Sequence, residues 1–395
     1  MLTNIKRYFD FSSINSSIKY LSIVAFFTGT VLGYFFTIIV ILQKYAGYSE
    51  STIGLIASSF SFGLMSAGFF VSKTLDRFGL FNTLIFSVCI QALCVISMFV
   101  YFNPINFVIC HFIMGLTGGM NWMTMDTWVN IVSNNNNRGK SIGLYNSAIS
   151  IGFGVGPLIV AVLGSKGSLP IFICLILMAF RIFMIILIKK HIENVEIPKQ
   201  KKQISFSFII MAPFVFVAIF IGGINDSTFG ALFPAFMINE FFSDRQIGFY
   251  YFLGAFAGVL SQPFVGALSD KIDKRKLIFI FLCGNIIWPL LLLKTINLDY
   301  AVYISVIIWG CSSISLYTVT LAYLGQRIKI KEIAIATSLF IIIYEAGEFI
   351  GPISVGIVMD SMGNNGFIYS LLIFTSFSII IGFIRSVLKN ENKNN

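Results

Sequence analysis

The sequence contains few charged residues. Lys, Arg, Asp and Glu make up 11% of its 395 residues, against about 25% in an average soluble domain. It has only two histidines, and its six cysteines lie within apolar runs without the C-x-x-C spacing of a metal site. These shortages exclude a soluble globular protein, a disordered chain, a nucleic-acid-binding domain and a secreted disulfide scaffold. Hydrophobic residues, at 57%, exceed what one core can enclose, so most of them must face lipid.

The hydrophobic residues form twelve runs, each with about the 20 residues that a helix needs to cross a bilayer. We place the spans at residues 20–42, 53–71, 81–102, 107–132, 141–163, 169–188, 213–236, 247–268, 277–293, 300–324, 333–359 and 367–388. This pattern predicts an all-α integral membrane protein with twelve transmembrane helices. The polar residues before position 20 contain no short apolar region followed by a cleavage site, so we expect the first span to be retained.

The charged segment 189–204 divides the spans six and six. We therefore predict an N-terminal six-helix bundle over residues 1–188, a cytoplasmic linker over 189–204 and a C-terminal six-helix bundle over 205–395. The two termini and the even-numbered loops hold 22 of the 27 Lys and Arg residues. Because cytoplasmic loops carry an excess of basic residues, both termini are expected in the cytoplasm, and the protein in a plasma membrane or bacterial inner membrane.

The two halves repeat each other. Gly29, Gly54 and Asp76 match Gly223, Gly248 and Asp270 at an offset of 194, and Gly115, Gly156 and Pro157 match Gly310, Gly351 and Pro352 at 195. Each pair falls in the corresponding span or loop. Because each unit has an even number of spans, the pattern predicts two bundles of the same topology, related by an axis along the membrane normal.

The loops after spans two and eight carry similar sequences. The first reads Ser72-Lys-Thr-Leu-Asp76-Arg77-Phe-Gly79 and the second Gly266-Ala-Leu-Ser-Asp270-Lys271-Ile-Asp273-Lys274-Arg275-Lys276. Both resemble the G-x-x-x-D-(R/K)-x-G-(R/K)-(R/K) signature of the major facilitator superfamily, in which this loop latches the outward-open state. The first copy lacks the distal basic residues, so its latch is expected to be the weaker one. A basic cytoplasmic loop with a helix cap is the alternative interpretation.

Gly152, Gly156 and Pro157 end a G-x8-G-x3-G-P pattern in span five, which resembles the antiporter-associated motif of the superfamily, although the closing glycine pair of that motif is absent. Small residues four apart permit close helix packing, and proline removes one backbone hydrogen bond. These residues, with Gly351 and Pro352 in span eleven, are the expected positions of helix bending. Ordinary packing by small residues is the alternative.

Span four carries two further polar residues. His111 begins an H-x-x-x-G sequence that resembles the family's R-x-x-x-G, with a packing histidine as the alternative. Met125-Asp126-Thr127-Trp128, followed by Arg138-Gly139, resembles the E-S-W and R-R-G pattern of the YcaD-like branch of the superfamily. Asp126 lies about 9 Å from the predicted cytoplasmic end of the span, at 1.5 Å per residue. That depth favours a gate ion pair with Arg77 or Arg138 over contact with a substrate.

Acidic residues within the hydrocarbon core are costly, which makes them candidates for function. Asp226 follows Asn225 in span seven, and Glu345 and Glu348 lie three apart on one face of span eleven. The repeat offsets place all three carboxylates near the middle of the membrane. The alternatives are mutual capping of Asn225 and Asp226 at a glycine break and hydrogen bonding of the glutamates to neighbouring helices. Arg181 in span six would neutralise one of these carboxylates or extend toward the membrane surface.

These features predict a secondary active transporter of the major facilitator fold, which moves a small organic solute by alternating access. Protons are the expected coupling ion, because a desolvated carboxyl group can load and release a proton. The proton-coupling or substrate candidates are Asp226, Glu345, Glu348, Asn225, His111 and Arg181, and the gate or latch candidates are Asp76, Arg77, Asp126, Arg138, Gly266, Asp270, Lys271 and Arg275. A proton-independent uniporter and a non-transporting receptor or scaffold of the same fold are the alternatives.

Neither H-E-x-x-H nor G-x-x-x-x-G-K-(S/T) occurs in the sequence. We therefore expect no enzymatic activity, no cofactor and no metal site. The expected partners are the solute, protons and membrane lipid, without nucleic acid, and we expect a monomer.

Overall fold

The structure is a computed structural model that describes residues 15–133, 138–189, 207–296, 298–328 and 332–394. Side chains are described in these ranges except at residues 138–140, 207, 270, 294, 295, 299, 334 and 385–394. All regular elements of the described ranges are helices, as predicted. The predicted linker 189–204 lies almost wholly outside the described residues.

The helices follow the order of the predicted spans. The first half consists of α2 (Ser16–Tyr45), α3 (Glu50–Val100), α4 (Pro104–Val132), α5 (Arg138–Leu163) and α6 (Leu169–Leu187). The second half consists of a short α8 (Ser207–Met211), then α9 (Pro213–Asn239), α10 (Asp244–Lys271), α11 (Lys274–Thr295), α12 (Asp299–Trp309), the π-helical η1 (Gly310–Ile314), α13 (Ser315–Arg327), α14 (Ile333–Met362) and α15 (Gly366–Asn394). Ten helical stretches of the described chain have the length and hydropathy to cross a membrane. α3 counts once among these ten but holds two spans, and α4, a helix of 29 residues, is not among the ten. With these two additions the count is the predicted twelve.

The loop predicted between spans two and three is helical instead. α3 runs continuously through Ser72 and Arg77, and its backbone leaves the helical conformation only at Gly79, where φ is 72° and ψ is 176°. Glycine has no β-carbon and therefore adopts a positive φ without strain. The structure thus corrects the predicted boundary, because a single glycine turns the chain between the two spans.

Glycines bring helices within each half into close contact. A β-carbon on Gly29 of α2 would lie 2.1 Å from a backbone oxygen of α5, and one on Gly223 of α9 would lie 2.1 Å from a backbone oxygen of α14. The matched residues Gly156 and Gly351 likewise face α2 and α9. Backbones approach this closely only where no side chain intervenes. The repeat predicted from the sequence is therefore also a repeat of helix contacts.

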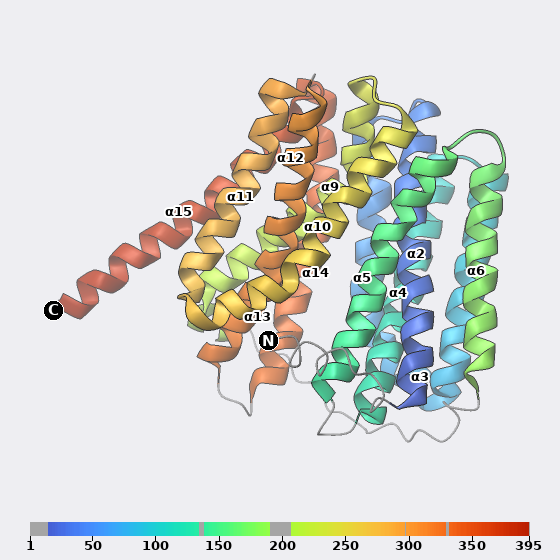
Figure 1. The fold of residues 1–395 in the computed structure, drawn as a ribbon, viewed down its shortest axis with the longest axis horizontal. Helices are drawn as coiled ribbons and strands as arrows, with labels where there is room; N and C mark the ends of the chain where they lie inside the picture. The colour runs from blue at the N-terminus through green and yellow to red at the C-terminus, as the bar shows by residue number, and fades with distance from the viewer. Residues whose placement is uncertain (1–14, 134–137, 190–206, 297, 329–331, 395) are drawn as a thin grey trace, which may run out of the picture.

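The buried hydrophobic residues form three clusters. The largest combines both halves, with residues such as Tyr34 and Phe233, and extends to the helix ends opposite the start of α2. The other two each belong to one half, around Trp128 in the first and Phe340 in the second. We call the end of the bundle where α2 begins and α6 ends the terminal face, and the opposite end the far face. The halves, which stand side by side in Figure 1, share a core toward the far face and have separate cores toward the terminal face.

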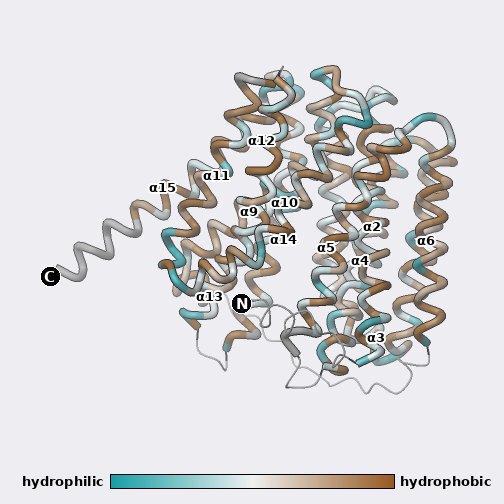
Figure 2. The backbone as a smooth tube through the Cα atoms, viewed as in Figure 1, coloured by the Kyte–Doolittle hydropathy of each residue, from teal (hydrophilic) through white to brown (hydrophobic). Residues whose placement is uncertain are grey.

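The outer surface of the bundle is hydrophobic. Large side chains such as Phe69, Phe172, Phe264 and Ile373 are more than half exposed. Figure 2 shows hydrophobic residues along the lengths of the helices and hydrophilic residues gathered mainly at the loops. An apolar surface of this extent is stable only against lipid. The six cysteines carry free thiols, as predicted.

Candidate functional site

Three carboxylates of the second half lie together, and we call Asp226, Glu345 and Glu348 the acidic cluster. Asp226 of α9 accepts a hydrogen bond from the Tyr344 hydroxyl at 2.9 Å. The carboxyl groups of Glu345 and Glu348 on α14 are within hydrogen-bonding reach of each other, and Glu348 lies within electrostatic range of Asp226. Because adjacent carboxylates repel, a shared proton stabilises the glutamate pair. All three side chains are partly exposed, although each belongs to a membrane-spanning helix.

Tyr251 of α10 directs its hydroxyl toward the acidic cluster. The side chain is 2% exposed, and its ring stacks on Phe229 with 5.2 Å between the centroids. The hydroxyl lies within electrostatic range of Asp226 and Glu348, and a β-carbon on Gly230, one turn after Asp226 on α9, would lie 3.2 Å from it. The Oδ1 atom of Asp226 is without a described partner.

One carboxylate of the first half faces the same boundary. Asp126 of α4 accepts a hydrogen bond from the Tyr145 hydroxyl of α5 at 2.9 Å, and the indole of Trp122, one turn earlier on α4, is within hydrogen-bonding reach. Asp126 is partly exposed, as the acidic cluster is. Tyr317 of α13 lies within electrostatic range of Asp126 and of both glutamates of the cluster. Asp126 of the first half and the glutamates of the second half thus lie within electrostatic range of the same tyrosine.

Arg181 of α6 points into the first half and away from the boundary. It is 1% exposed, and its guanidinium donates to the side-chain oxygens of Gln91 at 3.0 Å and Asn121 at 2.6 Å. It also lies within electrostatic range of Tyr145, the donor to Asp126. Its positive charge is thus behind the boundary and in no ion pair with a described carboxylate.

His111 and Asn225 are also buried within single halves. His111 is 2% exposed, and its Nδ1 lies 2.9 Å from the carbonyl oxygen of Phe107 in the same helix. Asn225 is fully buried and its amide donates to the Thr375 hydroxyl of α15 at 3.3 Å. Of the six coupling or substrate candidates, the structure brings only the three carboxylates together.

The far face is closed by hydrogen bonds between the halves. The carboxylate of Asp360, near the end of α14, accepts from the backbone N–H groups of Glu50 at 3.0 Å and Ser51 at 3.2 Å in the first turn of α3. These N–H groups have no partner within their helix and favour a negative charge. At the matched positions of the repeat, Asp244 in the first turn of α10 accepts a hydrogen bond from the Ser165 hydroxyl that follows α5.

Glycines and prolines of the repeat also meet across the boundary. A β-carbon on Gly54 of α3 would lie 2.2 Å from the backbone oxygen of Pro352 in α14. One on Gly248 of α10 would lie 2.6 Å from the backbone oxygen of Pro157 in α5. These are the residues that the repeat offsets match with each other. Both helices continue through these prolines, and the two prolines are thus contact points between the halves.

The first latch region lies at the terminal face. Asp76 and Arg77 are exposed, and the Arg77 guanidinium lies over the Phe78 ring, 5.3 Å from its centroid. The single ion pair among the described side chains, between Lys44 and Glu50, does not involve these residues, so Asp126 is not paired with Arg77 in this structure. The side chain of Arg138, the other predicted partner, lies outside the described residues.

The second latch region is similarly open. Gly266 of α10 has no heavy atom within 4 Å of the position of a β-carbon, and Lys271 is exposed. Arg275 of α11 hydrogen-bonds through its Nε to the Tyr323 hydroxyl of the same half. The side chain of Asp270 lies outside the described residues.

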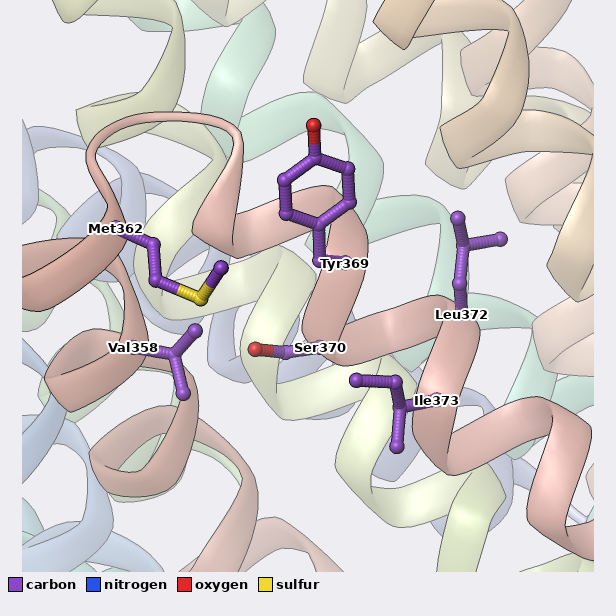
Figure 3. Close-up of a pocket in the computed structure, with 6 residues that line it drawn as sticks. All are labelled: Val358, Met362, Tyr369, Ser370, Leu372 and Ile373. Atoms are coloured by element: carbon purple, nitrogen blue, oxygen red, sulfur yellow. The ribbon is translucent and has the colours of Figure 1, made fainter.

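Two hollows on the outside of the bundle carry no chemistry for a solute site. One of about 560 Å³ lies between α14 and α15 and is lined by Val358, Met362, Tyr369, Ser370, Leu372 and Ile373 (Figure 3). The other, of about 470 Å³, is lined by residues of α8, α9, α14 and α15. Neither lining contains a charged side chain, so the candidate site is the carboxylate-bearing boundary between the halves.

Comparison with known proteins decides the family. The chain matches the model of the Major Facilitator Superfamily over residues 21–215 and 215–395. It belongs to that superfamily. The chain is therefore a membrane transporter of the major facilitator type, as its loop motifs and twelve spans predicted.

The relatives place it within the YcaD-like branch of the superfamily. The uncharacterized MFS-type transporter MJ1560 of Methanocaldococcus jannaschii is 26% identical over 92% of this chain and 95% of its own length. The uncharacterized MFS-type transporter YcaD of Salmonella arizonae is 20% identical over 86% and 88%. A bacterial homolog of the human lysosomal transporter Spinster, solved in an inward-facing and unoccupied conformation, has the same fold, with a TM-score of 0.76, 12% identity and coverage of 95% and 98%.

Sequence reasoning missed the tyrosines around the carboxylates. Tyrosine is usually enriched at the membrane interface, so a tyrosine within a span was the available signal. Tyr344 directly precedes Glu345, and Tyr251 lies inside span eight. It also missed Asp244 and Asp360, whose positions at span ends resemble those of ordinary loop charges.

Proposed function

We propose that this transporter moves a small organic solute by alternating access, coupled to protons, with the terminal face in the cytoplasm of a plasma or bacterial inner membrane. The observation that carries the proposal is the position of the carboxylates. Partly exposed acidic groups from both halves lie at the boundary, between a closed far face and separate cores at the terminal face. Burying charge in a membrane is costly, and a solute or proton path accounts for that cost.

The contacts between the halves support an inward-facing state. The far-face hydrogen bonds of Asp360 and Asp244 block entry from the opposite side, and no described ion pair links the halves at the terminal face. The Spinster homolog, whose fold matches, was solved in an inward-facing conformation. In the outward-facing state these bonds would break, and the latch residues of the terminal face would engage.

Proton coupling rests on the acidic cluster. A low-dielectric environment and a neighbouring negative charge both favour the neutral form of a carboxyl group, and rocking of the halves would change both. Glu345 and Glu348 lie three residues apart on α14, and carboxyl groups that interact strongly titrate as a pair. A non-transporting scaffold would not need such groups, and a uniporter would not need them to change protonation.

The test begins with a metabolite-release screen that compares cells with and without the protein, which identifies a solute. Purified protein in vesicles is then assayed for accumulation of that solute with and without an imposed pH gradient, and for counterflow. We expect accumulation only with the gradient. Counterflow that ignores the gradient would indicate a uniporter, and no solute movement in either assay would overturn the proposal.

A cross-link tests alternating access separately. Cysteines at Ser165 and Asp244, in a variant without the native cysteines, should form a disulfide that holds the far face closed. Oxidation should stop transport and reductant should restore it, while each single-cysteine variant should respond to neither. Full transport by the oxidised double variant would contradict closure at this position.

A further inference from the structure

We infer that the boundary site takes a protonated primary amine with an aromatic or apolar body, its ammonium group held by Asp226 and Tyr251. The inference rests on the proposed function, because it assumes that the partly exposed carboxylates line the solute path. It goes beyond that function by naming the chemistry of the solute.

The charges of the described site favour a cation. Asp126 and the acidic cluster contribute four carboxyl groups, and the glutamate pair can hold one proton between them. Arg181, which lies within electrostatic range of Tyr145, is turned into the first half and bound to two neutral amides. Negative charge therefore remains in excess at the boundary even when Arg181 is counted. An anionic solute would meet repulsion there, and a cationic one would be attracted.

Unused hydrogen-bonding atoms indicate a ligand with N–H donors. The Tyr251 side chain is almost fully buried and lies within electrostatic range of Asp226 and Glu348. The Oδ1 atom of Asp226 and the Oε2 atom of Glu345 are buried carboxylate oxygens that accept no described hydrogen bond. Leaving such groups unpaired is costly, so a bound partner is expected. An ammonium group has three donors and satisfies several of these oxygens at once.

Aromatic rings at the same place favour an apolar body. Tyr317 and Tyr344 meet edge-on with 5.2 Å between centroids, and both are partly exposed. Phe153 of the first half lies 6.4 Å from Tyr251 of the second, so rings from both halves flank the acidic cluster. Trp122, beside Asp126, is 40% exposed. Rings of this kind bind cations through their faces and bury an apolar body, and a proton-only path has no need of them.

The test measures binding of 2-phenylethylammonium to the purified full-length protein in detergent at neutral pH, where a primary alkyl amine is charged as lysine is. The neutral analogue 2-phenylethanol and the anion phenylacetate have a similar body and different head groups. The quaternary N,N,N-trimethyl analogue keeps the charge and loses every N–H donor. We expect saturable binding of the amine, binding at least tenfold weaker for the alcohol and the quaternary analogue, and none for phenylacetate.

Three variants locate the head group. Asp226→Asn should weaken amine binding at least tenfold, and Tyr251→Phe, which retains the ring and its stacking, should weaken it several-fold. Glu332→Gln, at the partly buried N-cap of α14 on the terminal face, is the matched control and should bind as the parent does. Thermal melting shows whether each variant is folded. If Asp226→Asn fails to fold, a folded Tyr251→Phe protein still tests the inference.

Several results would overturn the inference. These are equal binding of amine and alcohol, parental binding by folded Tyr251→Phe, or no saturable amine binding. The assay needs neither a gradient nor transport, so it separates the two proposals. Amine binding without gradient-driven accumulation would refute proton coupling alone, and gradient-driven transport of another solute without amine binding would refute this inference alone.

Discussion

The two halves of the transporter share their packing and differ in their chemistry. Gly29 and Gly223, and likewise Gly156 and Gly351, make the same close helix contacts at matched positions. By contrast, Asp226 of the second half matches Leu32 of the first. Duplication thus explains the architecture, and the substitutions made within it account for the site.

The charged groups show the difference most clearly. Glu348 matches Phe153, and Arg181 matches Ser376, so neither the carboxylates nor the buried arginine has a counterpart. Within the described chain, the second half has carboxylates facing the boundary, whereas the first has one carboxylate there and a cation behind it. We infer that the second half carries coupling and binding of the cation, and that the first half completes the closure.

The largest effect is expected from the acidic cluster. Asp226→Asn, Glu345→Gln and Glu348→Gln should be made singly and accumulation of solute in vesicles measured at several pH values. Neutralising the residue that carries the proton should reduce gradient-driven accumulation to the level of protein-free vesicles and spare exchange of solute down its own gradient. If all three variants still accumulate solute in response to the gradient, coupling lies outside the cluster, and His111 is the next residue to test.

Asp126 should give the next largest effect. Asp126→Asn removes the negative charge of the group that accepts from the Tyr145 hydroxyl, and it should lower the transport rate about tenfold, which corresponds to about 1.4 kcal/mol. Tyr145→Phe should lower it less, because the carboxylate remains. If Asp126 pairs with Arg77 or Arg138 in another state, a double variant that also neutralises the partner arginine should recover part of the rate. Strict additivity in both double variants would count against any such pair.

Tight contact between the halves predicts opposite effects of one substitution at two glycines. Gly54→Ala places a β-carbon 2.2 Å from the Pro352 oxygen and should destabilise the protein by about 1–3 kcal/mol. Gly143→Ala, in the interior of α5 with nothing within 4 Å, should stabilise it by up to about 1 kcal/mol. Thermal melting in detergent measures both. Equal shifts of the two melting temperatures would show that the close contact between Gly54 and Pro352 does not limit packing.

The smallest difference is expected between the two latch regions. Asp270→Asn should reduce the transport rate several-fold, and Asp76→Asn should reduce it less than twofold, because the loop of Asp76 lacks the distal basic residues. Both proteins should reach the membrane in parental amounts. Transport by Asp270→Asn at the parental rate, at equal expression, would refute the latch interpretation.

The sequence predicted the fold well because the bilayer imposes strong rules. The length of a span depends on the known thickness of the bilayer, and the distribution of basic residues depends on its polarity. Because the two halves repeat, each of these patterns could be read twice. The predicted loop between residues 71 and 81 was wrong, because a single glycine, Gly79, turns the chain there without a polar loop. The site was harder to predict. An acidic residue in a span signals function, yet its depth does not specify its partner, so Tyr145 rather than Arg77 contacts Asp126 in this structure.

The buried arginine constrains how the chain is made. An arginine within a span opposes insertion, by up to about 2.5–3.5 kcal/mol at the centre, and α6 offsets this with a mean hydropathy of 2.7, the highest of the ten membrane-spanning stretches identified in the described chain. Its amide partners, Gln91 and Asn121, precede α6 in the chain and are therefore synthesised before it. The Arg181 guanidinium can therefore replace its hydrogen bonds to water with hydrogen bonds to the side-chain oxygens of these two residues. A circular permutant that places α6 before α3 and α4 would expose the same arginine to lipid with no partner, so the order of synthesis is part of how this half assembles.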